Sequence, residues 1–137
     1  MTEYGLLGYP LGHSFSRAYF NKKFAAEGID AEYLNFEISS IEELPALLDA
    51  HPNLRGLNVT IPYKQAVIPY LDDLSDEARA IGAVNVIRIE RHGERHHLKG
   101  FNSDIIGFTE SMRPLLQPHH RCALVLGTGG EIGRAHV

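Results

Sequence analysis

The sequence has little of what would indicate an oxidising compartment, a membrane or a nucleic acid. It contains one cysteine, Cys122, so no internal disulfide can form, and we expect a reducing, cytoplasmic location. No apolar run approaches the roughly 18 residues that span a bilayer, and the first residues lack the basic start and apolar stretch of a signal peptide. The formal net charge of −4 comes without a basic run. We therefore expect no membrane and no nucleic acid as partners.

What is present indicates an α/β fold. The chain has 137 residues, 44% of them hydrophobic and 22% charged, as in a soluble globular domain. Strands are predicted over residues 4–8, 32–38, 57–61, 83–89, 96–101 and 123–126, and helices over 16–27, 75–81 and 104–116, with another helix after a capping box at 40–43. The alternation favours a mostly parallel sheet with helices on both faces. Pro114 and Pro118 mark a boundary, which divides the chain into 1–118 and 119–137.

Polar residues collect where the predicted strands end, which is where an open parallel sheet builds its binding site. Ser14 and Ser16 follow the first strand and lie near the start of a helix. Their hydroxyls, with the backbone N–H groups of a helix start, suit a carboxylate. The alternative is that either serine is a plain helix N-cap.

The strand in GLNVTIPYK carries Asn58 and Thr60 on one face and apolar residues on the other. Such a polar face is either exposed to solvent or hydrogen bonds to a ligand. Pro62 ends the strand, and Lys64 follows it. Taken alone, Lys64 is an ordinary surface lysine.

Two further polar residues, Asn85 and Asp104, each have a structural and a ligand-binding interpretation. Asn85 lies among small and β-branched residues, where its amide either satisfies a turn or holds a ligand hydroxyl. Asp104 opens a helix and taken alone is a cap. Beside a lysine it becomes an acid/base unit, because a carboxylate orients the ammonium group and shifts its pKa.

The apolar run 123–126 enters a glycine turn with Gly127, Gly129 and Gly130. A buried strand that leads into such a turn is how a dinucleotide-binding Rossmann domain begins, although a glycine turn after any strand looks similar. The adjacent pairs His96-His97 and His119-His120 lack the spacing of zinc ligands, so we expect no metal site.

The segments GYPLGHSFS, GLNVTIPYK, IGAVNVI, GFNSDIIGF and VLGTGG, in this order over residues 4–130, resemble the N-terminal part of shikimate dehydrogenase. The resemblance implies NADPH-dependent, reversible reduction of 3-dehydroshikimate to shikimate, on the route through chorismate to the aromatic amino acids. It implies a full-length protein that is a monomer or a homodimer.

The resemblance also implies roles for individual residues. Ser14 and Ser16 would hold the substrate carboxylate, and Lys64 and Asp104 would form the catalytic pair. Thr60, Asn85 and Asp104 would bind ring hydroxyls, with Asn58 on the same wall. Gly127, Gly129 and Gly130 would begin the NADP pyrophosphate loop.

Several positions depart from the family pattern. Arg17 and Phe20 stand where proline and histidine are usual, and Ser103 replaces a threonine. The last residues, EIGRAHV at 131–137, match the translation of a common sequencing adapter, so we expect them not to be native. We therefore expect a truncated chain that does not turn over alone, in which only the first strand of the Rossmann domain is present.

Two other interpretations remain. The chain could be a non-catalytic module that binds a hydroxylated acid. It could also belong to a related dehydrogenase that acts on quinate or prefers NAD.

Overall fold

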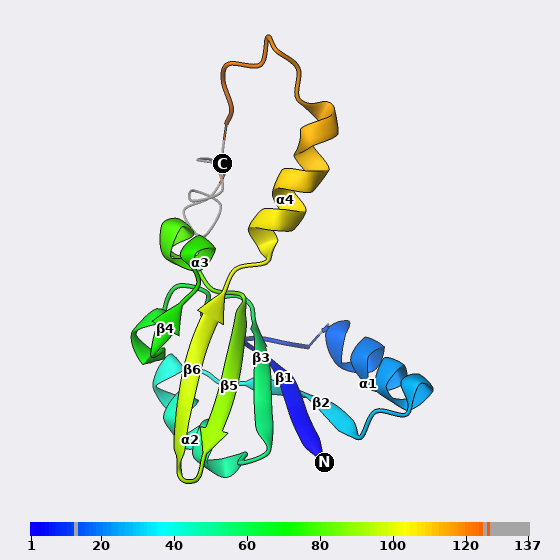
Figure 1. Cartoon of the computed structure of the whole chain (residues 1–137), viewed down its shortest axis with the longest axis vertical. Helices are drawn as coiled ribbons and strands as arrows, with labels where there is room; N and C mark the ends of the chain where they lie inside the picture. Colours follow the sequence, from blue (N-terminus) through cyan, green and yellow to red (C-terminus); the bar gives the residue numbers. More distant parts are fainter. Residues whose placement is uncertain (13, 125, 127–137) are drawn as a thin grey trace.

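Six strands form one mixed sheet in the order β2-β1-β3-β5-β6-β4 (Figure 1). The computed structural model describes residues 1–12, 14–124 and 126. The strands are β1 (Thr2–Gly8), β2 (Ala31–Glu37), β3 (Leu54–Val59), β4 (Asp73–Leu74), β5 (Val86–His92) and β6 (Arg95–Phe101). The helices are α1 (Ser16–Glu27), α2 (Leu44–Ala50), α3 (Asp76–Ile81) and α4 (Asp104–Met112).

Strand directions decide which loops meet. β1 pairs in parallel with β2 and β3, and β4 pairs in parallel with β6. β5 runs antiparallel to both β3 and β6. Three of the five pairings are thus parallel, and the expectation of a mostly parallel α/β sheet is confirmed.

Each face of the sheet has its own apolar cluster, because successive side chains of a strand point to opposite faces. Leu7, Leu57 and Ile87 belong to the larger cluster, which packs against α2 through Leu44 and Leu48. On the other face, Leu6 and Tyr33 pack with Phe20 and Phe24 of α1. Helices therefore cover both faces, as expected.

Local signals place several element ends correctly. α1 spans the residues expected for it and ends at Gly28, whose φ of 67° is the left-handed conformation that glycine adopts readily. The capping box is present: the Ser40 side chain accepts from the backbone and Glu43 bonds back to Ser40. Its first turn is a 3₁₀ helix, Ile41–Glu43, ahead of α2, in line with the irregularity that Pro45 implies. Within the described ranges, no helix has both the length and the apolarity to cross a bilayer.

Other boundaries differ from the sequence prediction. β3 stops at Val59 rather than at residue 61, and β5 begins at Val86 rather than at residue 83. The β5–β6 turn is shorter than expected, with Gly93 at φ 65°. α4 ends at Met112 and continues as a 3₁₀ turn that contains Pro114, because proline cannot continue the α-helical hydrogen bonding.

The strand predicted over residues 123–126 is wrong for the residues that are described. Ala123, Leu124 and Leu126 form no strand, and the two leucines are 83% and 84% exposed. A strand depends on a hydrogen-bonded neighbour, and this segment has none among the described strands.

Leu7→Ala should destabilise the domain strongly, because Leu7 is 0% exposed in the larger cluster. We expect the free energy of unfolding to fall by about 2–5 kcal/mol, measured by urea denaturation. Leu115→Ala is the matched control: Leu115 is 67% exposed, so its loss should cost less than about 0.5 kcal/mol. Equal losses in the two variants would contradict this assignment of the core.

Candidate functional site

One edge of the sheet collects the polar residues. β1, β3 and β6 end there, and β5 begins there because it runs antiparallel to its neighbours. Asn85, just before β5, therefore meets the loops that follow the other strands. Hydrogen bonds from Val59 N–H to the Asn85 carbonyl, 2.7 Å, and from Asn85 N–H to the Phe101 carbonyl, 3.0 Å, hold this junction together.

Lys64 and Asp104 form a close pair at this edge. Lys64 Nζ donates to Asp104 Oδ2 at 2.7 Å, and the side chains are 27% and 30% exposed. Asp104 is the first residue of α4, and Lys64 lies in the loop after β3. Val84 N–H donates to the Lys64 carbonyl at 2.7 Å, which fixes the backbone behind the ammonium group.

Asn85 and Ser103 bond reciprocally beside that pair. Asn85 Nδ2 donates to Ser103 Oγ at 2.9 Å, and Ser103 N–H donates to Asn85 Oδ1 at 2.9 Å. The interpretation in which Asn85 satisfies nearby backbone is thus correct for one of its bonds. One amide hydrogen and one lone pair remain for a ligand. The same two bonds fix the residue that precedes Asp104.

Asn102 anchors the start of α4, a role the sequence analysis did not assign. Its side chain is 5% exposed, donates to the Ala83 carbonyl at 3.0 Å and accepts from Ile105 N–H at 3.1 Å. The available signal was an asparagine just ahead of a helix start. By tying α4 to the segment before β5, Asn102 positions Asp104.

Ser14, Ser16 and Thr60 line one hollow of about 400 Å³, which we call the serine hollow. Leu6 and Leu11 lie on its apolar side. The Ser14 hydroxyl oxygen is buried and has no hydrogen-bond partner among the described residues. The N-cap of α1 is Phe15, without a side-chain cap bond, so the alternative that either serine caps this helix is wrong.

Gly8 makes room for that hollow. A β-carbon at residue 8 would lie 2.5 Å from Thr60 Cγ2 and 2.9 Å from Leu11 Cδ2. Contacts that short do not occur between carbon atoms in folded proteins, so glycine lets Thr60 approach the end of β1. Thr60 N–H still donates to the Leu7 carbonyl at 2.9 Å, which fixes Thr60 one residue beyond β3.

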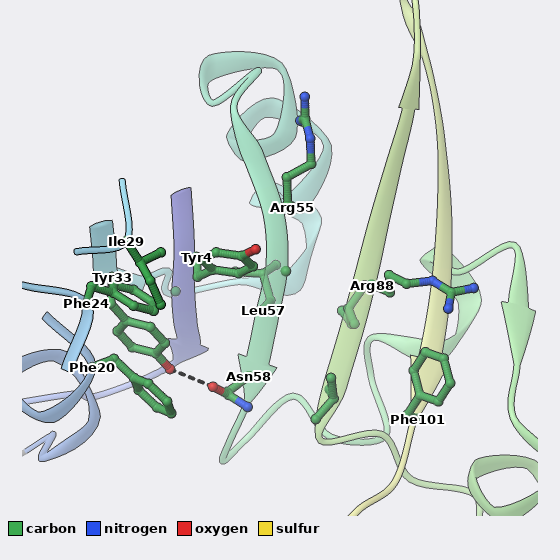
Figure 2. Close-up of a pocket in the computed structure, with 14 residues that line it drawn as sticks. Tyr4, Phe20, Phe24, Ile29, Tyr33, Arg55, Leu57, Asn58, Arg88 and Phe101 are labelled. Carbon is green, nitrogen blue, oxygen red and sulfur yellow. Dashed lines mark hydrogen bonds between the residues drawn. The ribbon is translucent and has the colours of Figure 1, made fainter. Parts of the chain in front are cut away.

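Asn58 lies beside a second, mostly apolar hollow of about 580 Å³ between α1 and β5 (Figure 2). Tyr33 donates from its hydroxyl to Asn58 Oδ1 at 2.8 Å. Burial raises the pKa of Tyr33 to about 12, and a side-chain hydrogen bond with Ser16 opposes that rise. Tyr33 thus connects Asn58 on β3 to Ser16 at the start of α1, and the sequence did not predict this connection.

The predicted site residues form three contiguous groups: the serine hollow with Thr60, the pair of Asn58 with Tyr33, and the Lys64–Asp104 pair with Asn85. Neither of the two hollows described above contains all of them. The predicted cofactor residues Gly127, Gly129 and Gly130 lie outside the described residues.

The sheet order, the helices on both faces and the polar loops at one edge define an α/β domain of the small-molecule-binding class. Comparison with known proteins makes this specific. Residues 6–87 match the family model described as the shikimate dehydrogenase substrate binding domain. The chain belongs to this family.

Curated relatives agree with the family model. The chain is 46% identical over 129 residues to the shikimate dehydrogenase (NADP⁺) of Syntrophomonas wolfei, and 40% identical over 130 residues to that of Aquifex aeolicus. These matches cover 92% and 93% of this chain but 42% and 46% of the relatives. The chain thus spans less than half the length of these relatives.

Solved structures show the same fold. Shikimate dehydrogenase 1 from Peptoclostridium difficile matches 99% of this chain and 51% of its own, with a TM-score of 0.82 and 36% identity. The Thermus thermophilus shikimate 5-dehydrogenase, described in complex with shikimate, matches 98% of this chain and 50% of its own, with a TM-score of 0.76 and 38% identity. The same protein is also described in complex with NADP(H) and shikimate.

The raised pKa of Tyr33 predicts a specific loss of stability at high pH. Below pH 10 the phenol is protonated in both states, whereas between pH 10 and about 12 the unfolded chain loses this proton and the folded chain keeps it. The free energy of unfolding should therefore fall more steeply with pH in the unmutated chain than in Tyr33→Phe. Urea denaturation at several pH values from 9 to 12 measures both slopes, and equal slopes would contradict the assignment.

Proposed function

We propose that this domain binds the substrate and transfers the proton in an NADP-dependent shikimate dehydrogenase, which reversibly reduces 3-dehydroshikimate to shikimate. The observation that carries the proposal is the 2.7 Å contact between Lys64 and Asp104. The pair lies at the edge of the sheet where β3 ends and where Thr60 lines the serine hollow. The family membership and the relatives' names support the choice of reaction.

The serine hollow suits the carboxylate of such a substrate. A carboxylate only accepts hydrogen bonds, and hydroxyls can donate to it. The Ser14 hydroxyl is buried without a partner among the described residues, a state that costs free energy unless a ligand satisfies it. Ser16 lines the same hollow, and its hydroxyl would turn from Tyr33 to the carboxylate to supply a second donor.

The remaining polar groups suit ring hydroxyls, each of which donates and accepts. Asn85 retains one donor and one acceptor beyond its bonds with Ser103. Asp104 would accept from a hydroxyl while it holds Lys64, and Thr60 would reach the same molecule from the end of β3. Asn58 would line this wall beside Thr60.

Lys64 would give its proton to the ring oxygen as the ketone is reduced, and take it back in the reverse direction. Asp104 holds the ammonium group in place. NADPH, when bound, supplies the hydride for the ketone carbon. Closing the site would exclude water and strengthen these polar contacts.

The cofactor would lie outside residues 1–118. Gly127, Gly129 and Gly130 would begin the pyrophosphate loop in residues 119–137, of which 131–137 would not be native. The complete enzyme would act in the cytoplasm, as a monomer or homodimer, in chorismate and aromatic amino acid biosynthesis. Its partners would be small molecules, with no nucleic acid or membrane.

Shikimate should bind this chain, and Asp104→Asn should weaken binding. Replacing the carboxylate removes a charge-assisted hydrogen bond, so we expect the Kd to rise about 10- to 100-fold, measured by calorimetry. Asp49→Asn, the same change in α2, away from the polar edge of the sheet, should leave the Kd unchanged. Absence of shikimate binding by the unmutated chain would contradict the proposed function.

Lys64→Ala should slow the reaction in a complete enzyme that carries this domain. General acid–base catalysis contributes about 10²- to 10⁴-fold, so kcat should fall by that factor while KM changes little. Lys22→Ala, at an exposed position of α1, is the control. An unchanged kcat in Lys64→Ala would refute the proton-transfer role.

A further inference from the structure

We infer that Tyr33 is a positioning residue that determines how Asn58 meets the ligand. Its hydroxyl engages the amide oxygen of Asn58, so that only the amide nitrogen remains to face the substrate. The inference rests on the proposed function, because it assigns a specificity to one wall of that site.

Tyr33 is held rigidly enough to act in this way. The side chain is 3% exposed, and its ring stacks on Phe20 with centroids 4.8 Å apart and an interplanar angle of 23°. The hydroxyl reaches across β1 to Asn58 Oδ1 on β3, at 2.8 Å (Figure 2). A buried ring with two rotatable bonds sets the position of its hydroxyl with little freedom.

The backbone of Tyr33 is fixed as well. Asn21 of α1 donates from Nδ2 to the Tyr33 carbonyl at 2.9 Å and accepts from Tyr33 N–H at 2.8 Å. β2 is an edge strand of the sheet, and these two bonds lock it to α1 at this one residue. Ser16 lies at the start of the same helix and hydrogen bonds with the Tyr33 side chain. Tyr33 therefore links the serine segment, β2 and Asn58.

The consequence for Asn58 is a fixed polarity. Its Oδ1 accepts from Tyr33, and no other described group bonds to Nδ2, which lies on the side of the amide away from Tyr33 in Figure 2. The side chain thus offers a donor to the site and selects an oxygen that accepts, such as a ring hydroxyl. Without the phenol, the amide could turn through 180° and present either end.

A double-mutant cycle on shikimate binding tests the inference, with Tyr33→Phe, Asn58→Ala and the double variant of this chain. If Tyr33 acts through Asn58, Tyr33→Phe alone should raise the Kd about 3- to 10-fold. In the Asn58→Ala background the same change should have little further effect. Additive effects, or no effect of Tyr33→Phe on the Kd, would overturn the inference while leaving the proposed function in place.

A second measurement does not depend on whether Asn58→Ala folds. The side-chain amide signals of Asn58 in the ¹⁵N spectrum should shift in Tyr33→Phe without ligand, and shikimate should perturb them less than in the unmutated chain. Tyr4→Phe removes a hydroxyl that makes no hydrogen bond to a described residue, near the same hollow, and should leave both signals and Kd unchanged. Unchanged Asn58 signals in Tyr33→Phe would overturn the inference. If the unmutated chain fails to bind shikimate, the proposed function fails first.

Discussion

The contact between Lys64 and Asp104 is the constraint on which the site depends, and its own energy does not hold it in place. A partly exposed ion pair contributes at most about 1 kcal/mol, too little to position two loops 40 residues apart in the chain. The surrounding bonds set the geometry: Val84 fixes the lysine backbone, and Asn102 fixes the helix that begins with Asp104. The distance between Lys64 and Asp104 therefore depends on these surrounding hydrogen bonds rather than on the attraction between the two charges.

Much of this arrangement could be predicted from the sequence, because the signals were local. Gly28 ends α1, Ser40 and Glu43 form a capping box, and the alternation around Asn58 shows which side of β3 is polar. Parallel strands then bring their carboxyl ends to one edge, so the polar residues after them were expected to be neighbours.

The rest depends on contacts between distant residues, which local patterns do not specify. Ser14 precedes α1 and Ser16 is its first residue, yet neither caps it, because the N-cap position is taken by Phe15. Tyr33 showed no functional signal, and Asn102 showed only its place ahead of a helix start, since each acts through hydrogen bonds to residues on other elements. The strand predicted at residues 123–126 had the right composition but no described neighbour to pair with.

The two halves of the site should form at different rates during folding, because only one of them lies on the β5–β6 hairpin. Asn85 and Ser103 face each other at its open end, only 18 residues apart, so hairpin closure can bring them together on the microsecond scale. Ser14 and Thr60 meet only when β1 and β3 pair in parallel, with α1, β2 and α2 between them in the chain, which is a slower, non-local event. One part of the site is thus set by a fast local step, and the other is completed when the sheet itself forms.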